Sequence, residues 1–147
     1  MLPLNPWEHY FPTKALYSAC MEPICRKHHI TRTELDILLF LANNPQYDTA
    51  AEIIEVRRLA KSHVSTSIKA LESSGFLTKY YRPGNKKTVH LSVDDSAKAL
   101  IADGRQAQEH FFHVIFDGFA EDDIELMQKF FSRIQENIKN YLEVHDL

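Results

Sequence analysis

Two stretches of the chain pair a capping signal with an apolar run, the usual start of an amphipathic helix. Thr31-x-x-Glu34 precedes LDILLFLA, a run that we expect to end near Asn43-Asn44-Pro45. Thr49-x-x-Glu52 precedes the shorter run AAEIIEV. The pattern therefore predicts two short helices between residues 31 and 57.

After residue 12, helical spacing also describes the rest of the chain outside one segment. Residues 1–12, rich in proline and aromatic residues, are expected to form an irregular arm; a helix follows over 13–29, and Pro23 should kink or break it. In the helix predicted over 62–74, Val64, Ile68 and Leu71 make an inward stripe. A long helix from Asp94-Asp95 to about Phe119, and a last one from Glu121, complete the pattern.

Between residues 77 and 93 the period changes from helical to alternating. FLTKYYR and KTVHLSV are rich in Tyr, Thr and Val, and Pro83-Gly84-Asn85-Lys86 separates them as a turn. In the second run Val89, Leu91 and Val93 share one face, and Thr88, His90 and Ser92 share the other. We expect a β-hairpin here.

Three short helices followed by a hairpin make a winged helix-turn-helix, in which the second helix of the turn enters the major groove of DNA. The fold class expected is mainly α with a small β-hairpin wing (α+β). We assign 31–93 to the winged helix-turn-helix domain, and 1–30 together with 94–147 to a helical dimerisation domain.

Composition and charge predict the cellular compartment of the protein and the kind of partner that it binds. The 147 residues are 44% apolar and carry a net charge of −3, yet 57–90 holds eight Lys or Arg against one acid, a local charge of +7. One concentrated basic segment on an acidic chain is typical of a polyanion-binding surface, although a solvated basic face would look the same. With two cysteines, no secretory signal and no apolar stretch long enough for a membrane span, we expect a cytoplasmic protein without a membrane partner.

The segment AEIIEVRRLAKSHVSTSIKALESSGFLTKYYRPGNKKTVHLSVDDSAKALI resembles the MarR family of bacterial transcriptional regulators. Val64-Ser65, Leu71-Glu72 and Gly75-Phe76-Leu77 carry the likeness, and ITRTELDILLFLA is similar to the family's second helix. The family's wing has Asp-x-Arg and then Leu-Thr-x-x-Gly. Here Asn85-Lys86-Lys87 and Val93-Asp94-Asp95-Ser96-Ala97 replace them, which questions the usual Asp–Arg pairing but leaves a basic tip.

The resemblance implies a homodimer, built by the N-terminal helix and the last two helices, that binds double-stranded DNA at a pseudo-palindromic operator, with repression relieved by a small-molecule inducer. Excess apolar surface in the terminal helices supports a dimer independently. His63 either reads a base or faces phosphate, and Arg57 or Arg58 could instead pair with Glu55 or Glu72. The expected DNA contacts are Arg32, Thr33, Arg57, Arg58, Lys61, Ser62, His63, Ser65, Thr66, Lys69, Arg82, Asn85, Lys86 and Lys87.

Family members respond to aromatic acids, oxidants or metals, and this chain offers a candidate for each. An apolar junction pocket would be lined by Tyr17, Leu38, Phe40, Phe111 or Phe112, unless these residues are plain core. Cys20 and Cys25 point away from each other on a helix, so we expect buried, inert thiols rather than a redox pair.

A zinc site is the third candidate, with no other cofactor expected. Zinc-sensing family members use a histidine pair in the fifth helix and a histidine early in the second, where this chain has Asp36. The alternative is ordinary surface or interface histidines. The candidate ligands are His28, His29, Asp36, Glu109, His110 and His113.

Two other classes of function compete with DNA binding. The chain has no glycine-rich phosphate loop, no nucleophile elbow and no His-Glu-x-x-His, so an enzyme is not expected. A winged helix used only for protein–protein contact is the other alternative, which the basic segment disfavours.

Overall fold

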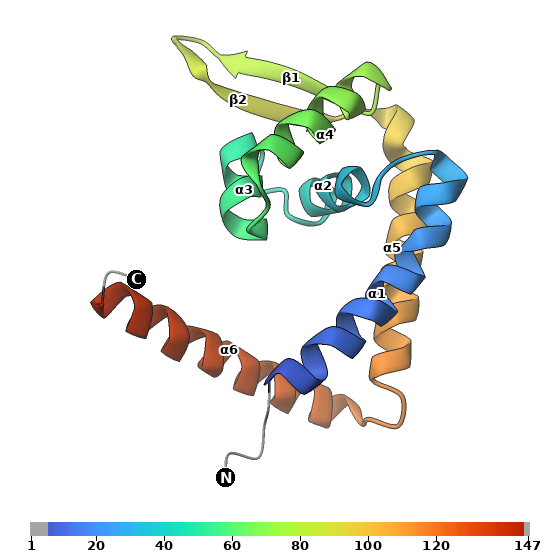
Figure 1. Ribbon diagram of the computed structural model, residues 1–147, viewed down its shortest axis with the longest axis vertical. Helices are drawn as coiled ribbons and strands as arrows, with labels where there is room; N and C mark the ends of the chain where they lie inside the picture. The colour runs from blue at the N-terminus through green and yellow to red at the C-terminus, as the bar shows by residue number, and fades with distance from the viewer. Residues whose placement is uncertain (1–5, 146–147) are drawn as a thin grey trace. The chain divides into compact units, whose positions relative to one another are not determined.

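The computed structural model describes residues 6–145 and shows a mainly helical chain with a two-stranded antiparallel sheet (Figure 1). This is the fold class expected from the sequence. The elements are α1 (Pro6–His28), α2 (Arg32–Asn43), α3 (Ala50–Arg57), α4 (Lys61–Ser73), β1 (Leu77–Arg82), β2 (Asn85–Val93), a short 3-10 turn at Asp95–Ala97, α5 (Lys98–Ile115) and α6 (Glu121–Val144).

The chain divides into two compact units at Phe111 and Phe112. The first unit holds α1 to α4, the hairpin and most of α5, and the second holds the end of α5 and α6. The division into a DNA-binding domain at 31–93 and a dimerisation domain around it stays a prediction. No helix within residues 6–145 is long and apolar enough to cross a membrane.

Both predicted capping boxes form. The Thr31 hydroxyl accepts from the Glu34 backbone N–H at 3.2 Å, and the Glu34 carboxylate accepts from the Thr31 N–H at 3.1 Å. Thr49 and Glu52 make the same reciprocal pair at 3.2 and 2.9 Å. Because each box satisfies amide groups that a helix start leaves without partners, α2 and α3 begin where the sequence pattern predicts.

The expectation of an irregular arm over 1–12 is wrong for the part that the structure describes, and residues 1–5 lie outside it. Helix α1 starts at Pro6 and continues through both Pro12 and Pro23. Of the two effects expected of Pro23, a kink or a break near Ala19, the break is absent from α1. A proline removes one helical hydrogen bond without ending the helix when neighbouring turns hold it. The Thr13 hydroxyl donates to the His9 carbonyl at 2.6 Å in one such turn.

The core of the first unit forms around α2. Leu35, Ile37 and Leu38 are fully buried, together with Leu39 at 2% exposure, so α2 is covered on nearly all sides. Val64, Ile68 and Leu71 of α4 pack into the same cluster, as the inward stripe predicts. Helix α4 is thereby held with its other side outward.

The hairpin forms over 77–93 as expected, with Leu77 opposite Val93 and Tyr80 opposite His90. On the face that it shares with Thr88 and Ser92, His90 is buried, and so is Leu91 on the opposite face. The loop before α3 pairs with β2 through an isolated bridge between Thr49 and His90 and a hydrogen bond from Leu91 N to Asp48 O at 2.7 Å. This loop covers His90.

The two C-terminal helices differ from expectation at the start of α5, which begins at Lys98 after the 3-10 turn rather than at Asp94-Asp95, and at the joint between α5 and α6. Helix α5 ends at Ile115 rather than near Phe119, and Gly118 adopts a positive φ of 80° in the turn that follows. Helix α6 begins at Glu121 as predicted, and the Asp123 carboxylate accepts from the Ala120 N–H at 3.2 Å. Glycine allows this left-handed turn without a Cβ clash.

Candidate nucleic-acid interface

The turn between α3 and α4 presents three cations. Arg57 ends α3, Arg58 follows in the left-handed region with a φ of 51°, and Lys61 starts α4. All three side chains are exposed. A left-handed conformation costs a non-glycine residue about 1 kcal/mol. The packing of α3 and α4, on either side of Arg58, must offset this cost.

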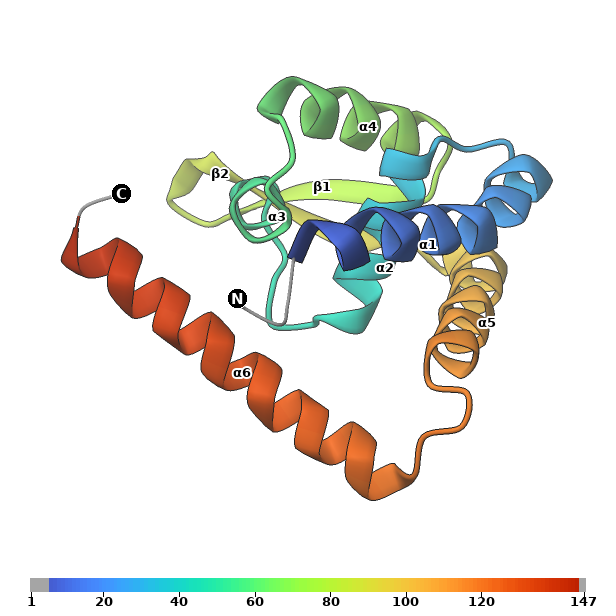
Figure 2. The ribbon, with the colours of Figure 1, turned by 60° about the horizontal axis from the view of Figure 1, so that its bottom comes forward.

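Helix α4 divides into a buried and an exposed side. Ser67 joins the apolar stripe in the core, and the remaining polar side chains face outward. Figure 2 shows α4 along the outer edge of the first unit. The exposed residues are those expected from the sequence, namely Ser62, His63, Ser65, Thr66 and Lys69.

The wing tip is basic and ordered by one side chain. Asn85 Oδ1 accepts from the backbone N–H groups of Lys87 at 3.0 Å and Thr88 at 3.2 Å. Its carboxamide oxygen is therefore occupied in shaping the turn, whereas Lys86, Lys87 and Arg82 are exposed. The hairpin projects past α3 and α4 in both views (Figures 1 and 2).

Acidic side chains organise the cations beside the wing. Glu72 of α4 pairs with Lys79 of β1 at 3.0 Å, so this acid, one of the two considered as partners of Arg57 or Arg58, is engaged by a lysine instead. Strand β1 follows α4 after a short turn and places Lys79 beside Glu72. This ion pair ties the strand to the helix.

A residue that the sequence did not single out, Asp48, lies at the base of the wing. Its Oδ1 is 2.9 Å from His90 Nδ1, and its Oδ2 accepts from the Tyr80 hydroxyl at 2.9 Å. Arg82 Nη2 lies 3.5 Å from Oδ2. Burial raises the pKa of Asp48, but the hydrogen bonds from His90 and Tyr80 and the charges of His90 and Arg82 outweigh burial and lower the pKa below its ordinary value. The carboxylate is therefore ionised at neutral pH.

Arg32, one of the expected DNA contacts, interacts with other side chains of the protein. Its Nε donates to Asp36 Oδ1 at 2.9 Å, and its guanidinium lies 4.7 Å from the centre of the Tyr17 ring. The neighbouring Thr33 is half-buried. DNA contact by either residue stays a prediction.

A small cavity of about 90 Å³ lies within the first unit where α1, α2, α3 and α5 meet. Gln108 donates to the Tyr17 hydroxyl at 2.9 Å and accepts from Asn43 Nδ2 at 3.0 Å, which joins three helices beside the cavity. Lining residues are Tyr17, Asp36, Leu39, Phe40, Asn43, Asn44, Arg57 and Gln108.

Two of the five residues expected in a junction pocket, Tyr17 and Phe40, line this cavity. Phe111 packs edge-on against Tyr17 at 5.1 Å. Leu38 is fully buried and is a core residue. Phe112 belongs to the second unit, where its ring stacks on Phe116. The structure therefore makes the lining more polar than the sequence suggested.

The histidine and acidic side chains considered as zinc ligands either pair with other side chains or are exposed to solvent. His28 Nε2 lies 2.7 Å from Asp103 Oδ2, and Asp36 pairs with Arg32. Glu109, His110 and His113 are exposed on α5, and His29 is exposed after α1. Within residues 6–145 no group of three or more His, Cys, Asp or Glu side chains is arranged to hold a metal ion.

The two cysteines are free thiols on α1. Cys25 is buried, and burial raises its pKa; the charge of Arg32 opposes this rise without cancelling it. The basic neighbours Arg26 and Lys27 thus fail to activate it. A thiol with a raised pKa is a poor nucleophile at neutral pH, which agrees with an inert role for Cys25.

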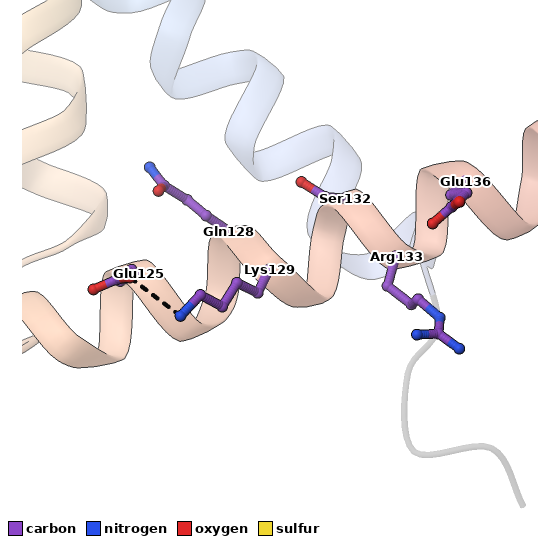
Figure 3. A pocket seen from close by; sticks show the side chains of 6 residues that line it. All are labelled: Glu125, Gln128, Lys129, Ser132, Arg133 and Glu136. Carbon is purple, nitrogen blue, oxygen red and sulfur yellow. Dashed lines mark ion pairs between the residues drawn. The ribbon is translucent and has the colours of Figure 1, made fainter.

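The polar side of α6 forms an open hollow of about 490 Å³. Figure 3 shows its side chains projecting from a single helix, with an ion pair between Lys129 and Glu125 at 3.1 Å. Because the described lining comes from one exposed helix face, this hollow is a solvated surface rather than a ligand cavity. The lining residues are Glu125, Gln128, Lys129, Ser132, Arg133 and Glu136.

Comparison with known proteins gives a family match and many similar folds. Residues 28–87 match the profile of the MarR family. A Listeria monocytogenes protein assigned to that family, solved in complex with a 26mer DNA, is 20% identical, with a TM-score of 0.82 over 99% of this chain and 96% of that one. No curated protein sequence matches the chain.

Two further solved structures have the same fold. MarR is 17% identical, with a TM-score of 0.76 over 96% of this chain and 95% of that one. BpsR of Bordetella bronchiseptica, whose DNA binding is regulated by 6-hydroxynicotinic acid, is 13% identical, with a TM-score of 0.65 over 84% of this chain and 93% of that one.

Proposed function

We propose that the chain is a repressor of the MarR family of DNA-binding transcriptional regulators, whose profile residues 28–87 match. In this proposal a homodimer binds a pseudo-palindromic operator, with half-sites about 10 bp apart. A small-molecule ligand then releases the DNA. The observation that carries the proposal is the exposed polar side of α4 beside a basic wing.

The exposed side chains suit the two kinds of contact that DNA requires. Ser62, Ser65 and Thr66 are short hydrogen-bonding groups on α4, suited to base edges and phosphates. With Arg, Asn and Gln absent from this exposed side of α4, His63 is the best candidate for a base contact. Lys86 and Lys87 in the wing would contact the minor groove or flanking phosphates.

The exposed apolar side of α6 supports the homodimer. Phe130, Phe131 and Ile138 are 60%, 58% and 54% exposed, on the side of the helix opposite the polar hollow. In α1, Tyr10 and Phe11 are also exposed. Apolar surface of this extent rarely faces water in a monomer, and a second copy of the same chain would cover it.

Ligand control is proposed at the cavity beside Tyr17. Its volume of about 90 Å³ is below that of ordinary ligand pockets, so an aromatic acid would have to part the surrounding helices. Arg57 lies both at this cavity and next to α4. Ligand entry would therefore move α4 and favour a spacing of the two recognition helices that no longer fits successive major grooves.

Selection of bound genomic fragments by the purified chain tests this function. We expect one palindromic site to be recovered at low salt, with or without a zinc chelator, and to be released by at least one acid from a panel of hydroxybenzoic and hydroxynicotinic acids. Recovery only with added zinc would make the regulator metal-responsive. Recovery of no fragment above background would contradict DNA binding, and full binding in the presence of a bound acid would contradict ligand control.

A further inference from the structure

We propose that Asp48 is a positioning residue for DNA binding, because its single carboxylate holds three wing side chains to the helix-turn-helix. Asp48 would not itself contact DNA. It would fix the direction in which the wing leaves the helices, so that the wing cations and α4 meet the same duplex. This inference rests on the proposed contact between the wing and DNA.

Asp48 is anchored on the helix-turn-helix side through its backbone. Its N–H donates to Glu52 Oε2 at 3.0 Å, the same carboxylate oxygen that caps the start of α3 at Thr49. Its carbonyl accepts from Leu91 N at 2.7 Å. Because both the backbone N–H and the backbone carbonyl of Asp48 are hydrogen-bonded, its Cα has a fixed position, and its carboxylate can act as a fixed acceptor.

The carboxylate reaches both strands of the wing. Tyr80 and Arg82 come from β1, and His90 comes from β2, where the Tyr80 and His90 rings stack at 5.3 Å. The ladder is irregular between Tyr80 and Arg82, so the carboxylate binds where the strands' own pairing is weakest. A two-stranded hairpin is marginally stable alone. Its direction therefore depends on such contacts with the rest of the fold.

Removing the negative charge of Asp48 distinguishes a positioning role from simple electrostatic repulsion of DNA. A carboxylate near DNA repels phosphate. Removing its charge should therefore tighten binding if Asp48 affected DNA only through its charge. A positioning role predicts the opposite, because loosening the wing adds an ordering cost to each binding event. Asp48→Asn keeps the shape of the side chain and removes the charge, so it distinguishes the two.

The test is fluorescence anisotropy with a labelled mixed-sequence duplex about 30 bp long, at low salt, with the full chain. We expect Asp48→Asn to raise the dissociation constant about tenfold, a change typical for loss of charge-assisted hydrogen bonds. Asp48→Glu, which restores the charge, should recover part of the affinity. The matched control is Glu55→Gln, an exposed acid on α3, which should bind equally or more tightly than the unchanged chain.

Each outcome decides one question. Equal or tighter binding by Asp48→Asn, or no recovery in Asp48→Glu, would overturn the positioning role while leaving DNA binding intact. If Asp48→Asn fails to fold, Tyr80→Phe replaces it in the test. Tyr80→Phe removes one hydrogen bond to the Asp48 carboxylate and should weaken DNA binding by a smaller factor. Unchanged affinity of Tyr80→Phe would also overturn the positioning role. Failure of the unchanged chain to bind the duplex would instead contradict the proposed function.

Discussion

Gly104 allows α5 to approach α2 more closely than any larger residue would. A Cβ atom built on it would lie 2.8 Å from Leu39 Cδ2 and 3.1 Å from Cδ1. Leu39 is buried in the core around α2, so it has little room to move aside. The glycine is unusual for a helix interior, where it costs about 1 kcal/mol relative to alanine, and the close approach explains its presence.

Gly104→Ala should therefore lower the free energy of unfolding, by about 1 kcal/mol once the better helix propensity of alanine is subtracted from the cost of overpacking. Chemical denaturation measures the change. In a Leu39→Ala background the obstacle is gone, and the same substitution should become neutral or stabilising. A loss of the same size in both backgrounds would contradict the explanation.

At the scale of elements, the wing combines a fixed base and a cationic tip. Asp48, Tyr80 and His90 meet at the base, whereas Lys86 and Lys87 at the tip are exposed. The two parts should affect DNA binding differently. The base governs geometry, and the tip supplies charge that displaces counterions from phosphate.

Replacing Lys86 and Lys87 with Ala should weaken binding to all duplex sequences by a similar factor. It should also flatten the plot of log affinity against log salt by about one unit for each phosphate that the protein no longer neutralises. Anisotropy titrations across a salt series measure the slope. As a control, Asp48→Asn should weaken binding with little change in slope, and an unchanged slope after the lysine replacements would show that they do not touch phosphate.

At the scale of the whole molecule, α6 has opposed faces. Ile134 and Ile138 lie on the apolar face, and Gln128 lies on the polar face drawn in Figure 3. No residue of α6 is buried within one chain. A helix whose apolar side stays exposed is stabilised mainly by what it packs against, so dimerisation and folding of α6 should be linked.

Ile138→Glu should therefore shift the chain from dimer to monomer and raise its dissociation constant for an operator with two half-sites by at least about 100-fold, since burying an unpaired carboxylate is costly. Light scattering after size exclusion and anisotropy measure the two effects. Gln128→Glu, with a similar change of charge on the polar face, should leave both unchanged. A variant Ile138→Glu that remains a dimer would remove α6 from the interface.

The short-range features of this protein were predictable from sequence. The two capping boxes, the α4 stripe and the hairpin turn at Pro83-Gly84 each depend on residues a few positions apart, so neighbouring side chains suffice to specify them. The resemblance to the MarR family likewise depends on contiguous motifs, and the family match over 28–87 confirms it. The continuation of α1 through Pro12 and Pro23 was not predictable, because local rules count only the hydrogen bond that each proline removes.

Only the tertiary structure decided which distant residues meet. Asp48 and His90 are 42 positions apart, and neither carries a signal that names the other. The pairing of Glu72 with Lys79 depends on the direction in which β1 leaves α4, and the polar cavity beside Tyr17 needs four helices to form. Sequence patterns determine which face of an element is apolar. The packing of those faces determines which polar side chains come together, and here it brings the wing to Asp48.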